Sequence, residues 1–242
     1  MHITPIINNV HISNSGQVKK GPVFGHGNES FWKSNYTTGQ KLLVAGTTAV
    51  GVFGSLLALS KFSGNSIKPK AFWKYLKNTP IKFAEVIAMG LGTCLGGLAG
   101  GYLIDKNPLN RKAKRREAIM QMGNISIPIG TVALTDMLLN KLNIGKQSTK
   151  SKLVRAVASL GAIISGIYLA NFAMNKISNK IFNESSNERG VKGTDLFPHI
   201  DDVLASGEYI LPNNNFIRKF SRVVPFALMV AGNEIGNKKA QY

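Results

Sequence analysis

The sequence has few acidic residues and a single cysteine. Its 242 residues include 12 Asp and Glu against 30 Lys and Arg, which gives a formal net charge of +18. One thiol, Cys94, allows neither an intrachain disulfide nor a cysteine metal cluster. The chain also lacks a Gly-rich phosphate loop, an HExxH motif, a nucleophile elbow and a CxxC pair. No motif therefore predicts catalysis, and we expect no cofactor and no metal.

Charged residues are absent from four long stretches of the chain. These runs are 42–60 (19 residues), 86–104 (19), 118–135 (18) and 156–175 (20). A helix rises about 1.5 Å per residue, so each run can cross a hydrocarbon core of roughly 30 Å. We therefore predict an all-α fold, a polytopic transmembrane helical bundle with four spans, and an integral multi-pass membrane location.

The composition divides the chain into three regions. Residues 1–40 are rich in Asn, Ser, Gly and Thr, which predicts a mobile polar tail. Residues 41–176 hold the four-span bundle. Residues 177–242 form a polar connector and a C-terminal segment, with one or two further membrane segments at 196–211 and 216–236 left open. A short, gapped similarity between 127–141 and 224–238 favours these additional segments.

The basic residues lie between the uncharged runs, in 61–82, 106–116 and 141–155. A charge of +18 is typical of nucleic-acid binding, but short basic loops beside membrane spans attract anionic headgroups, at about 1 kcal/mol per residue. We therefore expect the lipid bilayer and its anionic headgroups as the partner, nucleic acid being disfavoured. The chain itself or another membrane protein is a further candidate partner.

A helix is predicted near residues 70–77, with its aromatic and lysine side chains on separate arcs. Such a helix suits the headgroup boundary, although a loop helix packed on its own protein is the alternative. The residues assigned to the lipid interface are Trp73, Lys74, Tyr75, Lys77, Arg111, Lys112, Arg115 and Arg116.

Small residues recur four positions apart within the predicted spans. This spacing places them on one helix face, where another backbone can approach closely. The residues assigned to helix packing are Gly51, Ser55, Gly92, Gly96, Gly97, Gly100, Gly101, Gly161 and Ser165. Because 86–104 carries two such faces, we predict that it is the central helix. The first span would pack on one face through Gly51 and Ser55, and the fourth on the other through Gly161 and Ser165.

Several polar residues lie within or beside the spans. Pro128 removes one backbone donor and frees the carbonyl of Asn124, which the Asn124 side chain could satisfy. His199, Asp201 and Asp202 are of types that bind divalent metals, although their spacing alone builds no site. The speculative polar residues are Asn124, Asp136, His199, Asp201, Asp202 and Glu234.

Three classes of function follow from these features. A non-enzymatic structural or membrane-organising protein is favoured, because the well-formed features serve packing and lipid attachment. A small transporter or channel with a polar pathway near Pro128 and Asp136 is the alternative. A membrane-embedded enzyme comes third, since it rests on His199, Asp201 and Asp202 alone.

Overall fold

A computed structural model describes residues 36–62, 83–144, 148–183, 189–200 and 223–240, together with 64, 68 and 203. The helices within these residues are α1 (Thr38–Phe62), α3 (Phe83–Ile104), α4 (Pro108–Lys141), α5 (Thr149–Phe182), the 3-10 helix η2 (Gly193–His199) and α8 (Val224–Asn237). The predicted polar tail up to residue 35 and the interfacial helix near 70–77 lie outside the described residues.

Four helices, α1, α3, α4 and α5, are long and apolar enough to cross a membrane. The predicted all-α bundle with four spans is thus confirmed. Both α4 and α5 have 34 residues, which corresponds to about 51 Å. They exceed the uncharged runs because the helices continue through the flanking basic residues.

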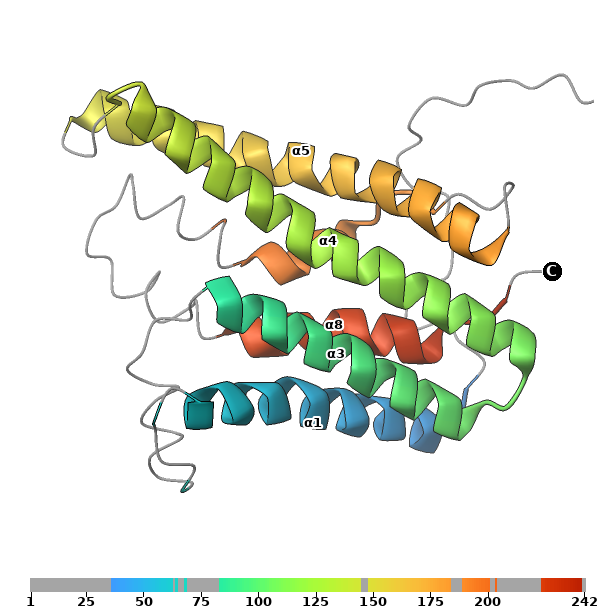
Figure 1. Ribbon diagram of the computed structural model, residues 1–242. Coiled ribbons are helices and arrows are strands. Elements are labelled where there is room, and N and C mark those ends of the chain that lie inside the picture. The colour runs from blue at the N-terminus through green and yellow to red at the C-terminus, as the bar shows by residue number, and fades with distance from the viewer. Residues whose placement is uncertain are drawn as a thin grey trace, which may run out of the picture.

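The helices are arranged in two groups (Figure 1). In the first, α1 lies along α3, and α8 packs against both. In the second, α4 and α5 form an antiparallel hairpin, and η2 lies between this hairpin and α8. Two elements from late in the chain, η2 and α8, thereby connect the two groups.

The seam between α1 and α3 leaves no room for a side chain at its glycines. A Cβ built on Gly92 would lie 2.2 Å from the carbonyl oxygen of Gly51, and one on Gly96 would lie 2.4 Å from that of Thr47. Real Cβ atoms do not approach other atoms this closely, so only glycine fits at these α3 positions and the two backbones touch directly. Ser55, whose Oγ lies 2.8 Å from the same Gly92 position, completes this seam.

The second small-residue face of α3 meets α8. A Cβ on Gly97 would lie 2.3 Å from the Gly232 oxygen, and one on Gly101 would lie 2.9 Å from the Gly236 Cα. The fourth span was predicted to pack on this face, and that prediction is wrong. Gly161 faces open space, with nothing within 4 Å of its Cβ position, and Ser165 is exposed.

The small-residue contact of α5 is made with α4 instead of α3. Gly166 lies against the backbone of Pro128, where an added Cβ would come within 2.5 Å of the Pro128 Cα. The fourth span pairs with the third because the short connector at 142–148 makes them sequential antiparallel neighbours.

The C-terminal segment forms a short helix inside the bundle. With 14 residues, α8 is about 21 Å long, too short to be a straight span. Pro225 lies at its first turn, whereas Pro128 lies inside α4, so the two similar stretches occupy different structural positions. Of the other suggested segment, 196–211, only 196–200 and 203 are described.

The outside of the bundle is apolar, and its interior holds buried charged side chains beside an apolar core. The outward faces carry exposed large apolar residues, among them Val157, Ile164 and Phe172 of α5. Lys114 and Arg155, by contrast, are almost completely buried. Many exposed apolar side chains together with buried charged ones are what a lipid surrounding favours, so the distribution agrees with a membrane protein.

Candidate functional site

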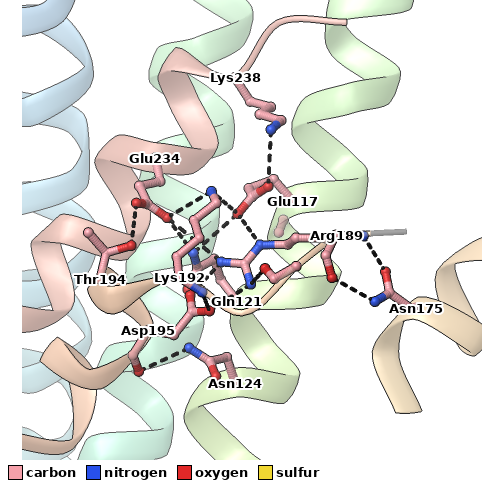
Figure 2. Close-up of polar contacts among 12 residues, drawn as sticks. Glu117, Gln121, Asn124, Asn175, Arg189, Lys192, Thr194, Asp195, Glu234 and Lys238 are labelled. Atoms are coloured by element: carbon pink, nitrogen blue, oxygen red, sulfur yellow. Dashed lines mark hydrogen bonds and ion pairs between the residues drawn. The ribbon is translucent and has the colours of Figure 1, made fainter. Parts of the chain in front are cut away.

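A network of buried charged residues joins α4, α5, η2 and α8 (Figure 2). Its carboxylates come from Glu117, Asp195 and Glu234, which expose no more than 7 % of their side chains. Its cations are Arg189, Lys192 and Lys238, with 9 %, 20 % and 30 % exposed. Three negative charges thus face three positive ones, and the cluster is formally neutral.

Arg189 is the centre of the network. Its guanidinium binds Asp195 through both terminal nitrogens, and its Nε donates to Glu117 Oε1 at 3.0 Å. Its backbone is held as well: the N–H donates to Asn175 Oδ1, and its carbonyl accepts from Asn175 Nδ2, both at 2.9 Å. One residue therefore ties α4, α5 and η2 together, and it lies 3.9 Å from Glu234 of α8.

Neutral side chains complete the coordination of the carboxylates. Gln121 donates from Nε2 to Glu234 at 2.7 Å and to Glu117 at 3.2 Å, and so bridges α4 and α8. Thr194 donates to the other oxygen of Glu234 at 2.7 Å. Each carboxylate has several donors, as buried charges require.

The carbonyl that Pro128 leaves without a backbone donor is satisfied from outside the helix. His199 donates from Nε2 to the carbonyl of Asn124 at 2.6 Å, because Pro128 has no N–H for this acceptor. The Asn124 side chain turns away and donates to the Asp195 carbonyl at 3.2 Å. The expectation that Asn124 satisfies its own carbonyl is therefore wrong, and η2 supplies the missing donor.

The neighbouring carboxylates favour the charged form of Arg189. Burial by itself lowers the pKa of Arg189, but Glu117, Asp195 and Glu234 outweigh burial and raise it. Burial also lowers the pKa of Lys238, and Glu117 offsets this only in part. Lys238 lies at the edge of the cluster, where the network meets the end of the bundle.

A second polar cluster closes the same end of the molecule. The buried Lys114 ammonium donates to the carbonyls of Gly236 and Lys238 at 2.7 Å and to the Tyr36 hydroxyl at 3.1 Å. Tyr36 in turn donates to Asp105. Burial raises the pKa of Tyr36, as does its hydrogen bond to that carboxylate. Lys114 thereby caps the C-terminal carbonyls of α8.

The speculative pathway residue Asp136 lies in a different place. It pairs with Arg155 at 2.5 Å, and the same guanidinium donates to Asn140 and to the Ile144 carbonyl. These contacts fasten the turn between α4 and α5. Asp136 is 12 residues, or about 18 Å, along α4 from Asn124, so the structure does not bring the two together.

The basic start of α4 is used partly within the protein. Arg111 stacks over Tyr102 and donates to the carbonyls of Tyr102 and Asp105 at the end of α3. Arg116 donates to Asn179 of α5 at 2.8 Å. Arg115 is exposed, with its guanidinium 6.0 Å from the Phe182 ring, and Lys112 is half-buried. The other assigned interface residues, Trp73, Lys74, Tyr75 and Lys77, lie outside the described residues.

Some residues of this site were predicted from the sequence. Asn124, His199 and Glu234 belong to it, whereas Asp201 and Asp202 lie outside the described residues. Glu117, Arg189 and Asp195 were not predicted. The spacing of Glu117, Gln121 and Asn124 places all three on one face of α4, a signal that could have identified the α4 side of the network.

Within the described residues, no group of three or more His, Cys, Asp or Glu side chains is placed to hold a metal ion. No protein-family model, curated protein or solved structure matches the chain.

Proposed function

We propose that this chain is a non-enzymatic, multi-pass structural or membrane-organising protein. The charge balance of the buried network carries the proposal: its three carboxylates and three cations neutralise one another. An unmatched buried charge costs several kcal/mol and is characteristic of sites that await a ligand or an ion. A network already neutral and hydrogen-bonded serves to fix helices, and this one links α4, α5, η2 and α8.

The lipid bilayer and its anionic headgroups are the proposed partner. Exposed Arg115 and the basic loops beside the spans would bind headgroup phosphates, while the apolar outer faces of α1 and α5 contact acyl chains. Contact with a second copy of the chain or with another membrane protein belongs to the same proposal.

Alkaline carbonate extraction of membranes tests the location. We expect the chain to stay in the membrane pellet, because its four apolar helices are inserted. Release into the supernatant would mean a peripheral protein and would overturn the proposal.

A small transporter is the second candidate, favoured by one observation. Glu117, Arg189 and Glu234 are buried in or beside α4, which contains Pro128, and ionisable groups in membrane bundles often serve transport. A flux assay in liposomes, with Glu117→Gln and Glu234→Gln compared with the wild type, separates the two functions. The structural proposal predicts no flux above that of empty liposomes. Reproducible flux that either substitution abolishes would overturn it.

A further inference from the structure

An arm of three residues follows α8 and lies across the start of α4. It consists of Lys238, Lys239 and Ala240, all of them half-buried. The Lys238 carbonyl accepts a hydrogen bond from the Lys114 ammonium at 2.7 Å, and the Ala240 N–H donates to Asn110 Oδ1 at 2.9 Å. Asn110 and Lys114 are four residues apart, so the arm is fastened to α4 at two points about one helical turn apart.

One face of α4 binds both the arm and the charge network. Its polar side chains follow one another at spacings of four and three residues, which keeps them on one side of the helix. They are Asn110, Lys114, Glu117, Gln121 and Asn124. The first two bind the arm, and the other three belong to the network. Along α4, the arm therefore lies between the start of the helix and the network.

The exposed edge of the network is the edge next to the arm. Lys238 is the most exposed of the charged side chains, whereas Gln121 and Asn124 are buried. Figure 2 shows Lys238 at one edge of the network and Asn124 at the opposite edge. Past Asn124, Ile125 and Ile129 of α4 belong to the apolar core. Water can therefore approach the network from the side of the arm, while the apolar core closes the other side.

Lys238 belongs to the arm through its backbone and to the network through its side chain. Its ammonium lies 3.8 Å from Glu117 Oε2, whereas Arg189 and Lys192 pair with Glu117 Oε1. Within the described residues, Lys238 is thus the cation that faces Oε2. If the arm detaches, Lys238 leaves with it. Three carboxylates then face two cations, and the network carries one net negative charge.

The arm can detach while α8 stays in place. Gly232 and Gly236 touch the backbone of α3, and Lys114 also binds the Gly236 carbonyl at 2.7 Å, so α8 is held without the arm. The arm contains no large apolar side chain, and its remaining contact is the Lys239 ammonium 4.2 Å from the centre of the Tyr36 ring. Segments with few buried apolar contacts open locally at low cost.

We propose that residues 238–240 form a lid on the charge network. Closed, the lid supplies the third cation of the network; open, it admits water and small cations from the end of the bundle where α4 starts. The inference goes beyond the proposed function, because it concerns access to the network and holds whether the network fixes helices or serves transport.

The first test weakens the lid in the full chain. Ala240→Pro removes the N–H that donates to Asn110, and Ala240→Gly is the matched control that keeps it. The reporter is Gln121→Cys in a Cys94→Ala background, in sealed vesicles treated with methanethiosulfonate ethyltrimethylammonium, a small membrane-impermeant cation. We expect Ala240→Pro to label about two- to tenfold faster than Ala240→Gly, the range for one lost hydrogen bond, and from one side of the membrane only.

The native thiol distinguishes an open lid from a displaced helix. Cys94 belongs to an apolar cluster with Ile235 of α8, so it stays covered as long as α8 is in place. In a chain that keeps Cys94 and Gln121, Ala240→Pro should leave the labelling of Cys94 as slow as in the wild type.

The second test removes the cation that the lid supplies. In the Gln121→Cys reporter chain, Lys238→Met should raise the labelling rate of the cationic reagent, relative to a neutral methanethiosulfonate of similar size, by about fivefold or more. Lys180→Met is the control, because Lys180 is exposed on α5 and should leave this ratio unchanged.

A reporter that does not fold loses its protease resistance. Hydrogen exchange of the Lys192 amide, which donates to Asp195 at 2.8 Å inside the network, then replaces the labelling. The same two- to tenfold ratio between Ala240→Pro and Ala240→Gly is expected, for the same lost hydrogen bond.

Three results would overturn the lid. They are equal rates in Ala240→Pro and Ala240→Gly, fast labelling of Cys94 in Ala240→Pro, which would mean that α8 moves with the arm, and an unchanged reagent ratio in Lys238→Met. Carbonate extraction separates this failure from that of the proposed function. A chain that stays in the pellet but shows equal rates overturns the lid alone.

Discussion

The helices within each of the two groups are held together by different means. Between α1, α3 and α8, backbones touch at Gly92 and Gly97, and close contact supplies the attraction. Between α4, α5 and η2, oppositely charged and hydrogen-bonding side chains meet around Arg189. Lipid offers no hydrophobic force between helices, so a membrane bundle depends on contact or on polar bonds, and this chain uses each in a separate region.

The helix α8 takes part in both kinds of contact. Gly232 and Gly236 lie four residues apart on the face that meets α3. Glu234 lies about 200° around the helix from Gly232 and enters the charge network. A helix of 14 residues thus presents a backbone seam on one side and an ionic contact on the other. We therefore expect added side-chain volume to destabilise the glycine seam, and the loss of a charge to destabilise the network.

The largest expected effect comes from Arg189→Met. The substitution leaves Glu117 and Asp195 buried without their main counter-charge, while the size of the side chain is roughly kept. We expect a loss of about 3–5 kcal/mol in the free energy of unfolding, measured by steric trapping in bicelles.

Arg115→Met provides the control for that loss. Its exposed guanidinium stacks on Phe182, a contact worth about 0.5–1 kcal/mol, so the variant should unfold almost as the wild type does. Equal losses of unfolding free energy in the two variants would mean that the network does not hold α4, α5 and η2 together.

The next effect tests the glycine seams. Gly97→Leu collides with the Gly232 carbonyl, and Gly96→Leu with that of Thr47, so each should cost about 1–3 kcal/mol or more. Both should lower protease resistance and raise maleimide labelling of Cys94, whose buried Sγ lies 3.8 Å from the Ala118 carbonyl.

Two substitutions keep the seam test specific. Gly161→Leu adds the same volume where nothing lies within 4 Å, and Leu98→Ile keeps the volume on α3 itself. Both should behave as the wild type. If Gly97→Leu matches them in both assays, the backbone contact between α3 and α8 does not stabilise the bundle.

A smaller effect is expected from the hydrogen bond between His199 and the Asn124 carbonyl, which lies apart from the ion pairs of the network. His199→Phe leaves the Asn124 carbonyl buried without a donor, which should cost about 1–3 kcal/mol. Pro128→Ala restores an N–H to this carbonyl from within α4, so in that background His199→Phe should cost clearly less. Unfolding of the four proteins in a double-mutant cycle measures the coupling, and strictly additive losses would contradict the assigned role of His199.

The smallest effect concerns the partly exposed end of the bundle. Burial raises the pKa of Asp105, but hydrogen bonds from Tyr36, Asn107 and Asn110 outweigh burial and lower it. A lowered folded-state pKa means that Asp105 stabilises the fold above its unfolded value of about 3.9, and that this contribution is lost as the pH falls through the folded value. The difference in thermal stability between wild type and Asp105→Asn should thus be constant near neutral pH and shrink in acid. A difference that grows on acidification would contradict this prediction.

The sequence predicted the four spans because their signal is local. An uncharged run of about 20 residues is sufficient to identify a span, whatever packs against it. The close-packing face at Gly92 and Gly96 could also be predicted, because residues four positions apart lie on one helix face. The neighbour on the Gly97 face was not, because many helices with small residues can approach such a face equally well.

What the sequence alone determined is the four long apolar helices and the presence of close-packing faces on α3. Only the tertiary structure decided that α8, and not the fourth span, fills the second face, and that Glu117, Arg189 and Asp195 meet. The physical reason is range: helix length and periodicity depend on residues a few positions apart. An ion pair between residues 117 and 189, which are 72 positions apart, depends on how the whole bundle closes.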